Sequence, residues 1–225
     1  MDIAAQRGYE AARPETRTTA RVIGSGSFVE ALVGAGAVAL AILGLADILP
    51  LWMATIATIA IGAAFLIEGI SISSRMAEMM ESDKAGHFDI AEVGGGITAE
   101  FLAGLSGITL GVLALLGIQP VTLMAIALIV YGGALIMSSG TTSRLNYLSN
   151  INLPTNSAKM MAKEALNAAA GLQVVAGVGS AVLGILALVD QPRFTFVLVG
   201  LLIVSASRLI TGTALGGRLM GMFRG

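Results

Sequence analysis

Residues 100–144 read EFLAGLSGITLGVLALLGIQPVTLMAIALIVYGGALIMSSGTTSR, with no charged side chain between Glu100 and Arg144. A membrane-spanning helix needs about 20 apolar residues, so this stretch is long enough to cross a bilayer twice. A tight turn from Gly117 to Pro120 separates the two crossings. The stretch therefore predicts a helical hairpin in a membrane.

The same pattern occurs in two further copies, one upstream and one downstream. Each copy has a polar residue, a glycine, a proline and a basic residue in the same order. Glu30, Gly34, Pro50, Gly62 and Arg75 match Glu100, Gly104, Pro120, Gly132 and Arg144, and Gln173, Gly177, Pro192 and Arg218 follow. The interval from the polar residue to the proline is twenty, twenty and nineteen residues. Three such hairpins predict an all-α integral membrane protein with six transmembrane helices and a pseudo-threefold internal repeat.

The composition agrees with a protein surrounded by lipid. The chain of 225 residues is 56% hydrophobic and 12% charged, whereas about a quarter of the residues in soluble domains are charged. The 29 glycines and the few aromatic residues predict helices that pack through small side chains. The absence of cysteine excludes disulfides and thiolate chemistry. A net charge of -1 without a basic patch provides no general attraction to nucleic acid, so no nucleic-acid partner is expected, and the expected partner is the lipid bilayer.

The repeats and the polar stretches between them divide the chain into seven parts. We expect a polar N-terminal cytoplasmic tail at 1–27, hairpin repeat 1 at 28–75, a cytoplasmic amphipathic connection at 76–96, hairpin repeat 2 at 97–144, a cytoplasmic connection at 145–165, hairpin repeat 3 at 166–218 and a C-terminal tail at 219–225.

Helix start and stop signals place the apolar helices within these parts. We expect helices at about 28–45, 50–73, 97–116, 121–139, 157–189 and 194–215. Ser157 can cap the fifth helix, which then runs continuously through Lys159 and Lys163 into its apolar part. The spacing of Met76, Met79 and Met80 predicts a separate short amphipathic helix on the membrane surface.

The distribution of positive charge predicts the orientation in the membrane. Eleven basic residues lie in the tail, the two long connections and the C-terminus, whereas the three tight turns contain Arg193 alone. Cytoplasmic loops carry the excess of lysine and arginine, so both termini are expected in the cytoplasm.

The paired helices resemble those of the HdeD family of bacterial inner-membrane proteins. The resemblance depends on a GxLAL-like segment followed by a proline: Gly44-Leu45-Ala46 with Pro50, Gly111-Val112-Leu113-Ala114-Leu115 with Pro120, and Gly184-Ile185-Leu186-Ala187-Leu188 with Pro192. It implies a six-helix protein of the bacterial inner membrane, linked to acid or envelope stress. It implies no catalytic residues.

Glu30, Glu100 and Gln173 occupy one equivalent position in the three repeats. If the repeats surround a pseudo-threefold axis, these side chains converge at one depth near the cytoplasmic edge of the hydrocarbon. One interpretation is a proton- or cation-binding polar ring, because intramembrane carboxylates usually face a cavity or a partner. The other is that the three residues lie at the membrane interface, hydrated or bonded to backbone amides.

Two further features concern helix packing. Glu68 and Arg208 lie in the second and sixth helices, where they either form an ion pair or extend separately to the interface. Glycines mark faces by which the first, third and fifth helices are expected to approach one another. These glycines are Gly34, Gly104, Gly107, Gly111 and Gly177.

The sequence contains few candidates for chemistry. Met76, Met79, Met80 and His87 contain the ligand types that bind copper(I), although methionines at this spacing also suit an apolar helix face. His87 is the single histidine, so no serine, histidine and acid set is available. We therefore expect no catalytic residue, no metal site and no cofactor.

These observations favour a non-enzymatic membrane protein that acts by packing. It is expected to be an HdeD-like stress-associated protein or an accessory subunit of a larger membrane complex, and to form homo-oligomers or join other subunits. The alternative is a small channel that conducts protons or cations through the ring of Glu30, Glu100 and Gln173.

Overall fold

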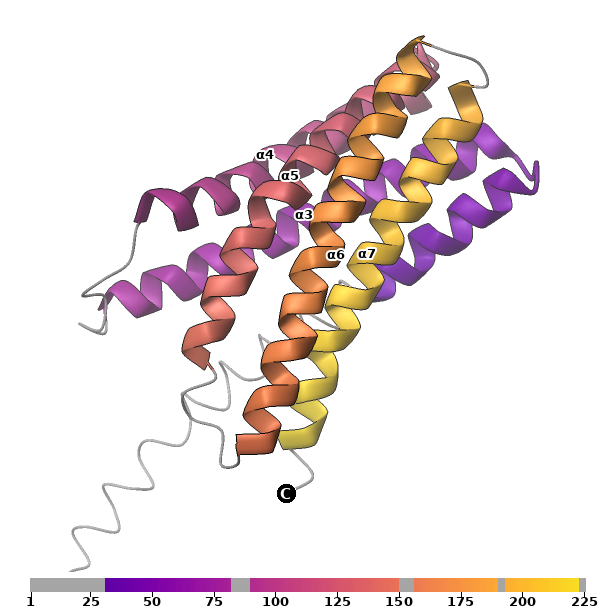
Figure 1. The fold of residues 1–225 in the computed structure, drawn as a ribbon. Helices are drawn as coiled ribbons and strands as arrows, with labels where there is room; N and C mark the ends of the chain where they lie inside the picture. The colour runs from indigo at the N-terminus through magenta and orange to yellow at the C-terminus, as the bar shows by residue number, and fades with distance from the viewer. Residues whose placement is uncertain (1–30, 82–89, 150–155, 190–192, 223–225) are drawn as a thin grey trace, which may run out of the picture.

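A computed structural model describes residues 31–81, 90–149, 156–189 and 193–222. All regular structure in these ranges is helical (Figure 1). A helix at Ala31–Leu45 is followed by five long helices. These are α3 (Pro50–Glu81), α4 (Ile90–Leu115), α5 (Pro120–Ser149), α6 (Asn156–Val189) and α7 (Arg193–Met222).

Each of the five long helices contains a segment that is long and apolar enough to cross a membrane. The segments are Pro50–Ile70, Thr98–Leu115, Pro120–Ser139, Ala170–Val189 and Arg193–Thr213. The helix Ala31–Leu45 is apolar but shorter. The prediction of an all-α, multi-pass membrane protein is therefore confirmed at this level.

Several helices are longer than predicted from the sequence. α3 continues to Glu81, so the segment with Met76, Met79 and Met80 extends α3 rather than forming a separate helix. Alanine, methionine and glutamate favour helix, and neither glycine nor proline interrupts the segment. α5 likewise extends to Ser149. α6 runs without a break from Asn156, as expected for its polar start.

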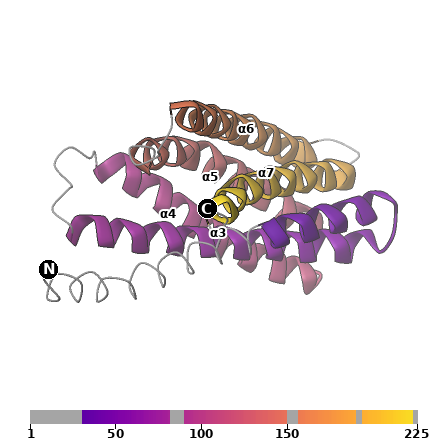
Figure 2. The same cartoon turned by 90° about the horizontal axis from the view of Figure 1, so that it is seen from below.

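The second helices of the hairpins form the inside of the bundle. α3, α5 and α7 all contact one another, while α4 packs against α3 and α5, and α6 against α5 and α7. Figures 1 and 2 show α5 lying beside both α4 and α6. The helix Ala31–Leu45 packs against α7, since a Cβ on Gly34 would lie 2.7 Å from the backbone nitrogen of Leu209.

This arrangement corrects the prediction that the first helices of the three hairpins pack against one another through their glycines. α4 and α6 do not contact each other in the described part of the chain, so their glycines are not the faces by which they meet. A Cβ on Gly104 would lie 2.8 Å from the carbonyl oxygen of Gly62 in α3, and one on Gly177 would lie 2.6 Å from that of Gly132 in α5. The prediction was wrong because glycines show which face approaches a neighbour, not which neighbour it is.

The turns after Ala31–Leu45 and after α4 have the same backbone structure. Asp47 (φ 62°) and Gly117 (φ 85°) occupy the left-handed position after the helix end. The amide of Ile48 donates to the carbonyl of Leu43 (3.0 Å), and that of Ile118 donates to Leu113 (3.2 Å). These six-to-one hydrogen bonds define a Schellman motif, which ends each helix before the proline begins the next.

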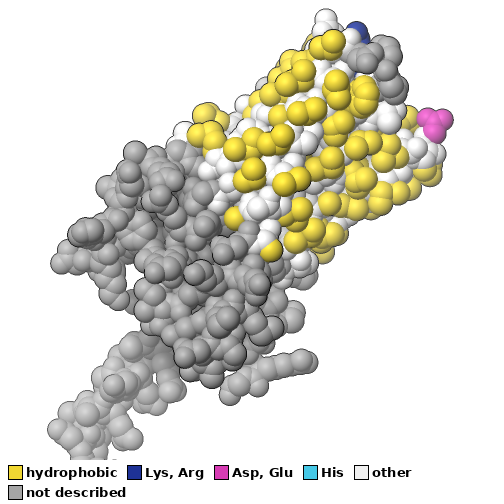
Figure 3. All heavy atoms as spheres, in the orientation of Figure 1, with side chains coloured by type: hydrophobic (Ala, Val, Ile, Leu, Met, Phe, Trp, Pro, Cys, Tyr) yellow, Lys and Arg dark blue, Asp and Glu magenta, His cyan; other side chains and the backbone are white. Residues whose placement is uncertain are grey.

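The outer surface is apolar. Figure 3 shows hydrophobic side chains covering the described part of this face, with charged side chains only at one end. The exposed large apolar residues are most numerous on α6, where they include Val175, Val182 and Ile185, and α4 contributes others such as Leu102 and Leu105. A surface of this kind suits contact with lipid chains.

Candidate functional site: a buried polar layer

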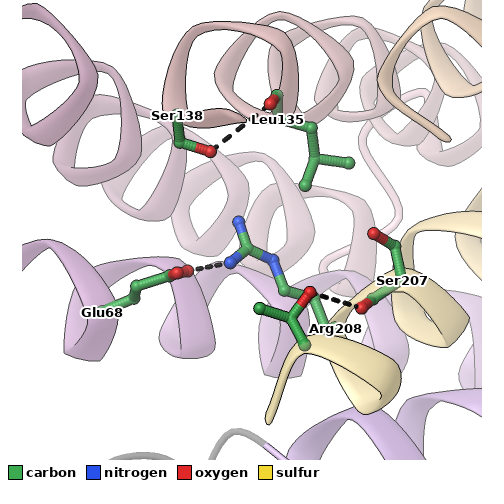
Figure 4. Close-up of polar contacts among 6 residues, drawn as sticks. Glu68, Leu135, Ser138, Ser207 and Arg208 are labelled. Atoms are coloured by element: carbon green, nitrogen blue, oxygen red, sulfur yellow. Dashed lines mark hydrogen bonds and ion pairs between the residues drawn. The ribbon is translucent and has the colours of Figure 1, made fainter. Parts of the chain in front are cut away.

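Arg208 of α7 and Glu68 of α3 form an ion pair inside the bundle. Nη1 of Arg208 donates to Oε2 of Glu68 (Figure 4). The Arg208 side chain is 1% exposed and that of Glu68 is 13% exposed. The arginine therefore does not extend separately to the membrane interface. A buried pair of this kind offsets the cost of placing each charge in an apolar environment.

Two stacked aromatic rings lie next to this ion pair inside the bundle. The guanidinium carbon of Arg208 lies 3.8 Å from the centre of the Phe65 ring, which is a cation–π distance. Phe65 stacks on Tyr131 with 5.2 Å between ring centroids. The Tyr131 hydroxyl donates to the carbonyl oxygen of Thr58 (2.6 Å). Gly107 leaves room for the tyrosine, because a Cβ there would collide with the phenol.

The three inner helices differ from one another at the positions that form the ion pair. Counted from the first residues of α3, α5 and α7, Phe65, Leu135 and Arg208 occupy the same position. Three residues later, α3 has Glu68, whereas α5 and α7 have hydroxyl residues, Ser138 and Thr211. The charged pair therefore has no counterpart on α5, which carries leucine and serine at these positions.

The hydroxyl groups near the ion pair bond to their own helices. The Ser138 hydroxyl donates to the carbonyl of Leu135 (3.4 Å), and the Thr211 hydroxyl donates to that of Ser207 (2.9 Å). Figure 4 shows the Arg208 guanidinium with Glu68 on one side, Ser207 on the other and Ser138 above it. The arginine thus lies among polar groups from three inner helices.

Glu100 and Gln173 are both 0% exposed. α4 begins at Ile90 and α6 at Asn156, so both residues lie well inside their helices rather than at their starts. This burial does not agree with hydrated side chains at the membrane interface. Glu30, the third member of the predicted ring, lies outside the described residues, and the convergence of the three side chains stays a prediction.

The neighbours of Gly104 and Gly177 show how deep Glu100 and Gln173 lie in the bundle. Gly104 lies opposite Leu66, and Gly177 lies opposite Ile136. One turn further along each antiparallel pair, Glu100 is level with the turn of α3 that contains Glu68, and Gln173 is level with the turn of α5 that contains Ser138.

We call Glu68, Glu100, Ser138, Gln173 and Arg208 the polar layer. At 1.5 Å per residue, all five lie about 22–27 Å from the turn-side ends of their helices. Within the described residues, the amide oxygen and nitrogen of Gln173 are buried and have no hydrogen-bond partner. The layer is therefore the main concentration of buried polar groups that the structure describes.

Phe65, Tyr131 and Ser138 were not predicted as parts of a site. The sequence contained one signal for Tyr131, because it is a polar aromatic residue that lies next to Gly132 within an apolar segment. Buried tyrosine hydroxyls usually find a hydrogen-bond partner. The partner could not be deduced, since the Thr58 carbonyl belongs to another helix.

No family model, curated protein or solved structure matches the chain in our comparisons. Across the part of the chain that the structure describes, no three histidine, aspartate or glutamate side chains are grouped closely enough to hold a metal ion. The side chains of Met76, Met79, Met80 and His87, which contain ligand types that bind copper(I), lie outside those described.

Proposed function

We propose that the protein is a non-enzymatic, six-span membrane protein that acts by packing against other membrane helices. It is either an HdeD-like stress-associated protein or an accessory subunit of a larger membrane complex. The HdeD-like sequence pattern supports the first form. The proposed fold is three tandem hairpins with a pseudo-threefold repeat, in which Ala31–Leu45 belongs to the first span.

The observation that carries this proposal is the filled centre of the bundle. Where α3, α5 and α7 meet, the side chains of Phe65, Leu128, Tyr131 and Leu201 are all 0% exposed. Conduction of an ion needs a wetted path with polar groups along it. A centre occupied by aromatic and aliphatic side chains favours a packing role over transport.

The surface supports the same function. Its lipid-facing helices present apolar side chains that other membrane helices can contact as readily as lipid. The two described turns are short, which argues against an extramembrane catalytic site between these helices. The bias of basic residues supports an orientation with both termini in the cytoplasm. The HdeD-like sequence pattern supports a location in the bacterial inner membrane.

A mass measurement tests the proposal. The protein is extracted in a mild detergent or in lipid nanodiscs, and its native mass is compared with the mass of 22.8 kDa calculated for one chain. We expect a homo-oligomer, or a complex with another membrane protein that survives purification. A strictly monomeric protein under both conditions would contradict a packing role.

The full burial of Glu100 and Gln173 favours one second candidate, a proton- or cation-conducting channel. Reconstitution into vesicles separates the two functions. We expect no selective current or proton flux from the unmodified protein, and a folded double variant Glu30→Gln with Glu100→Gln. A proton flux that disappears in this double variant would reject the packing proposal and establish the channel.

A further inference from the structure

The two turns that the structure describes expose large apolar side chains. Ile48 and Leu49 precede α3, Leu116 and Ile118 precede α5, and the four side chains are between 49% and 72% exposed. Turns that face water are usually built from glycine, proline, asparagine, aspartate and serine. Exposed apolar patches, in contrast, mark surfaces that contact a partner or a membrane. These four residues therefore indicate a surface that contacts something other than water.

The apolar surface of the turns continues the lipid-facing surface of the helices. Leu45 and Leu115, the last residues of their helices, are exposed, and so are Leu51 and Trp52 at the start of α3. Figure 3 shows hydrophobic side chains extending toward the end of the bundle at which the described charged side chains lie. Lipid that covers the helices can therefore also cover the turns.

The lengths of the helices place the two turns at the edge of the hydrocarbon. The apolar segments that adjoin them are Pro50–Ile70, Thr98–Leu115 and Pro120–Ser139, with 21, 18 and 20 residues. At 1.5 Å per residue these segments are about 27–32 Å long, and the hydrocarbon of a bilayer is about 30 Å thick. Little of any helix remains to raise a turn into water, so the turns begin where the hydrocarbon ends.

The backbone of the turns suits this boundary. In each turn three consecutive amides, those of residues 46–48 and 116–118, donate to carbonyls of the preceding helix. Pro50 and Pro120, which begin the next helices, have no amide hydrogen. Unpaired backbone groups are excluded from hydrocarbon, and this bonding allows the turns to contact acyl chains. The first amides after each proline find no acceptor within their own helix, and headgroup oxygens can accept from them.

Trp52 independently indicates the same depth. It is 53% exposed and lies in the first turn of α3. Tryptophan is enriched at the headgroup level of membranes, because its ring contacts acyl chains while its N–H donates to polar groups. Trp52 is the single tryptophan of the chain. Its place beside the turns is that of an interfacial anchor.

We propose that Ile48, Leu49, Trp52, Leu116 and Ile118 form a lipid-binding surface, the turn surface, which inserts at the boundary between headgroups and acyl chains. Its ligands are the phospholipids of the leaflet that contains the turns. The other conceivable occupants are a protein outside the membrane and the turn end of a second copy, and continuity with the lipid-facing helices favours lipid over both. The third turn, at 190–192, lies outside the described residues and is not included. The inference is independent of whether the protein acts by packing or conducts ions.

Tryptophan fluorescence of the full chain in phosphatidylcholine vesicles tests the proposal. Trp52 reports on the unmodified protein. Ile48→Trp and Leu116→Trp, each combined with Trp52→Phe, place the single tryptophan in one turn or the other. Ile126→Trp in the same background is a control, because Ile126 is also exposed but lies about 9 Å deeper along α5. Lipids brominated near the headgroup, at mid-chain or near the chain end quench tryptophan at the matching depth, whereas iodide on both sides of the vesicles quenches tryptophan in water.

We expect lipid brominated near the headgroup to quench the turn-surface tryptophans most strongly, and lipid brominated at mid-chain to quench the α5 control most strongly. Iodide should quench the turn-surface tryptophans several-fold less than free N-acetyltryptophanamide. The proposal is overturned if iodide quenches them as strongly as the free compound, because the turns then lie in water. It is also overturned if neither quencher reaches them, because a protein or a second copy then covers the turns. If the substituted variants do not fold, Trp52 in the unmodified protein decides between the same outcomes.

Discussion

Arg208 depends on Glu68 because neither charge is favourable alone inside the bundle. Removing one partner of a buried ion pair costs about 3–5 kcal/mol, since the other charge is left uncompensated, whereas replacing both by well-packed neutral residues is often tolerated. The chain itself provides the replacement, since α5 has Leu135 and Ser138 at the corresponding positions.

We therefore expect Arg208→Leu to lower the free energy of unfolding by about 3–5 kcal/mol, and Glu68→Ser with Arg208→Leu to recover most of that loss. Denaturant unfolding in a mild detergent measures both, with Glu68→Ser completing the double-mutant cycle. A double variant whose loss of stability equals the sum of the losses in the two single variants would show that the pair contributes no coupling.

Glycines of this chain differ sharply in the space around them. A Cβ at Gly107 would collide with the Tyr131 phenol, whereas a Cβ at Gly36 would meet no atom within 4 Å. Gly107→Ala should therefore displace the phenol and lower stability by about 1–3 kcal/mol. Gly36→Ala, also in a helix, should be neutral or stabilising by up to about 1 kcal/mol. Thermal unfolding of the two variants in the same detergent provides the comparison, and equal melting temperatures would argue against the tyrosine packing.

At the scale of the element, the two Schellman turns decide where one helix stops and the next begins. Gly117 and Asp47 hold the same left-handed position, which glycine adopts without strain and aspartate or asparagine tolerates better than other residues. The sequence located both turns correctly from their prolines. It could not indicate the left-handed geometry at Asp47, because aspartate also occurs in ordinary turns.

The turn geometry predicts a rank order at one position. Gly117→Ala should cost about 1 kcal/mol, because alanine is strained at φ 85°, and Gly117→Asn should cost less. Asp47→Gly should be neutral or stabilising. Melting temperatures of the three variants test this order. If Gly117→Ala is as stable as the unmodified protein, the turn does not limit stability.

For the whole molecule, the orientation in the membrane is the property that the sequence predicts most directly. Basic residues concentrate on the side of the long connections, so positions 82 and 150 should face the cytoplasm and position 191 the outside. The chain contains no cysteine, which allows Ser82→Cys, Asn150→Cys and Gln191→Cys to be labelled individually. An impermeant thiol reagent added to intact cells should label only position 191. Labelling at position 82 or 150 would reverse the topology.

The sequence by itself determined the helical, membrane-spanning character and the positions of the tight turns. Both depend on local features, namely the length of an apolar run and the presence of proline after it. Only the tertiary structure decided that α3, α5 and α7 lie inside. The glycines of α3 and α5 are as suited to close contact as those of α4 and α6, so their pattern left the partners open. The ion pair likewise joins residues 140 positions apart, and two charges on separate helices meet only when the packing of the bundle brings their faces together.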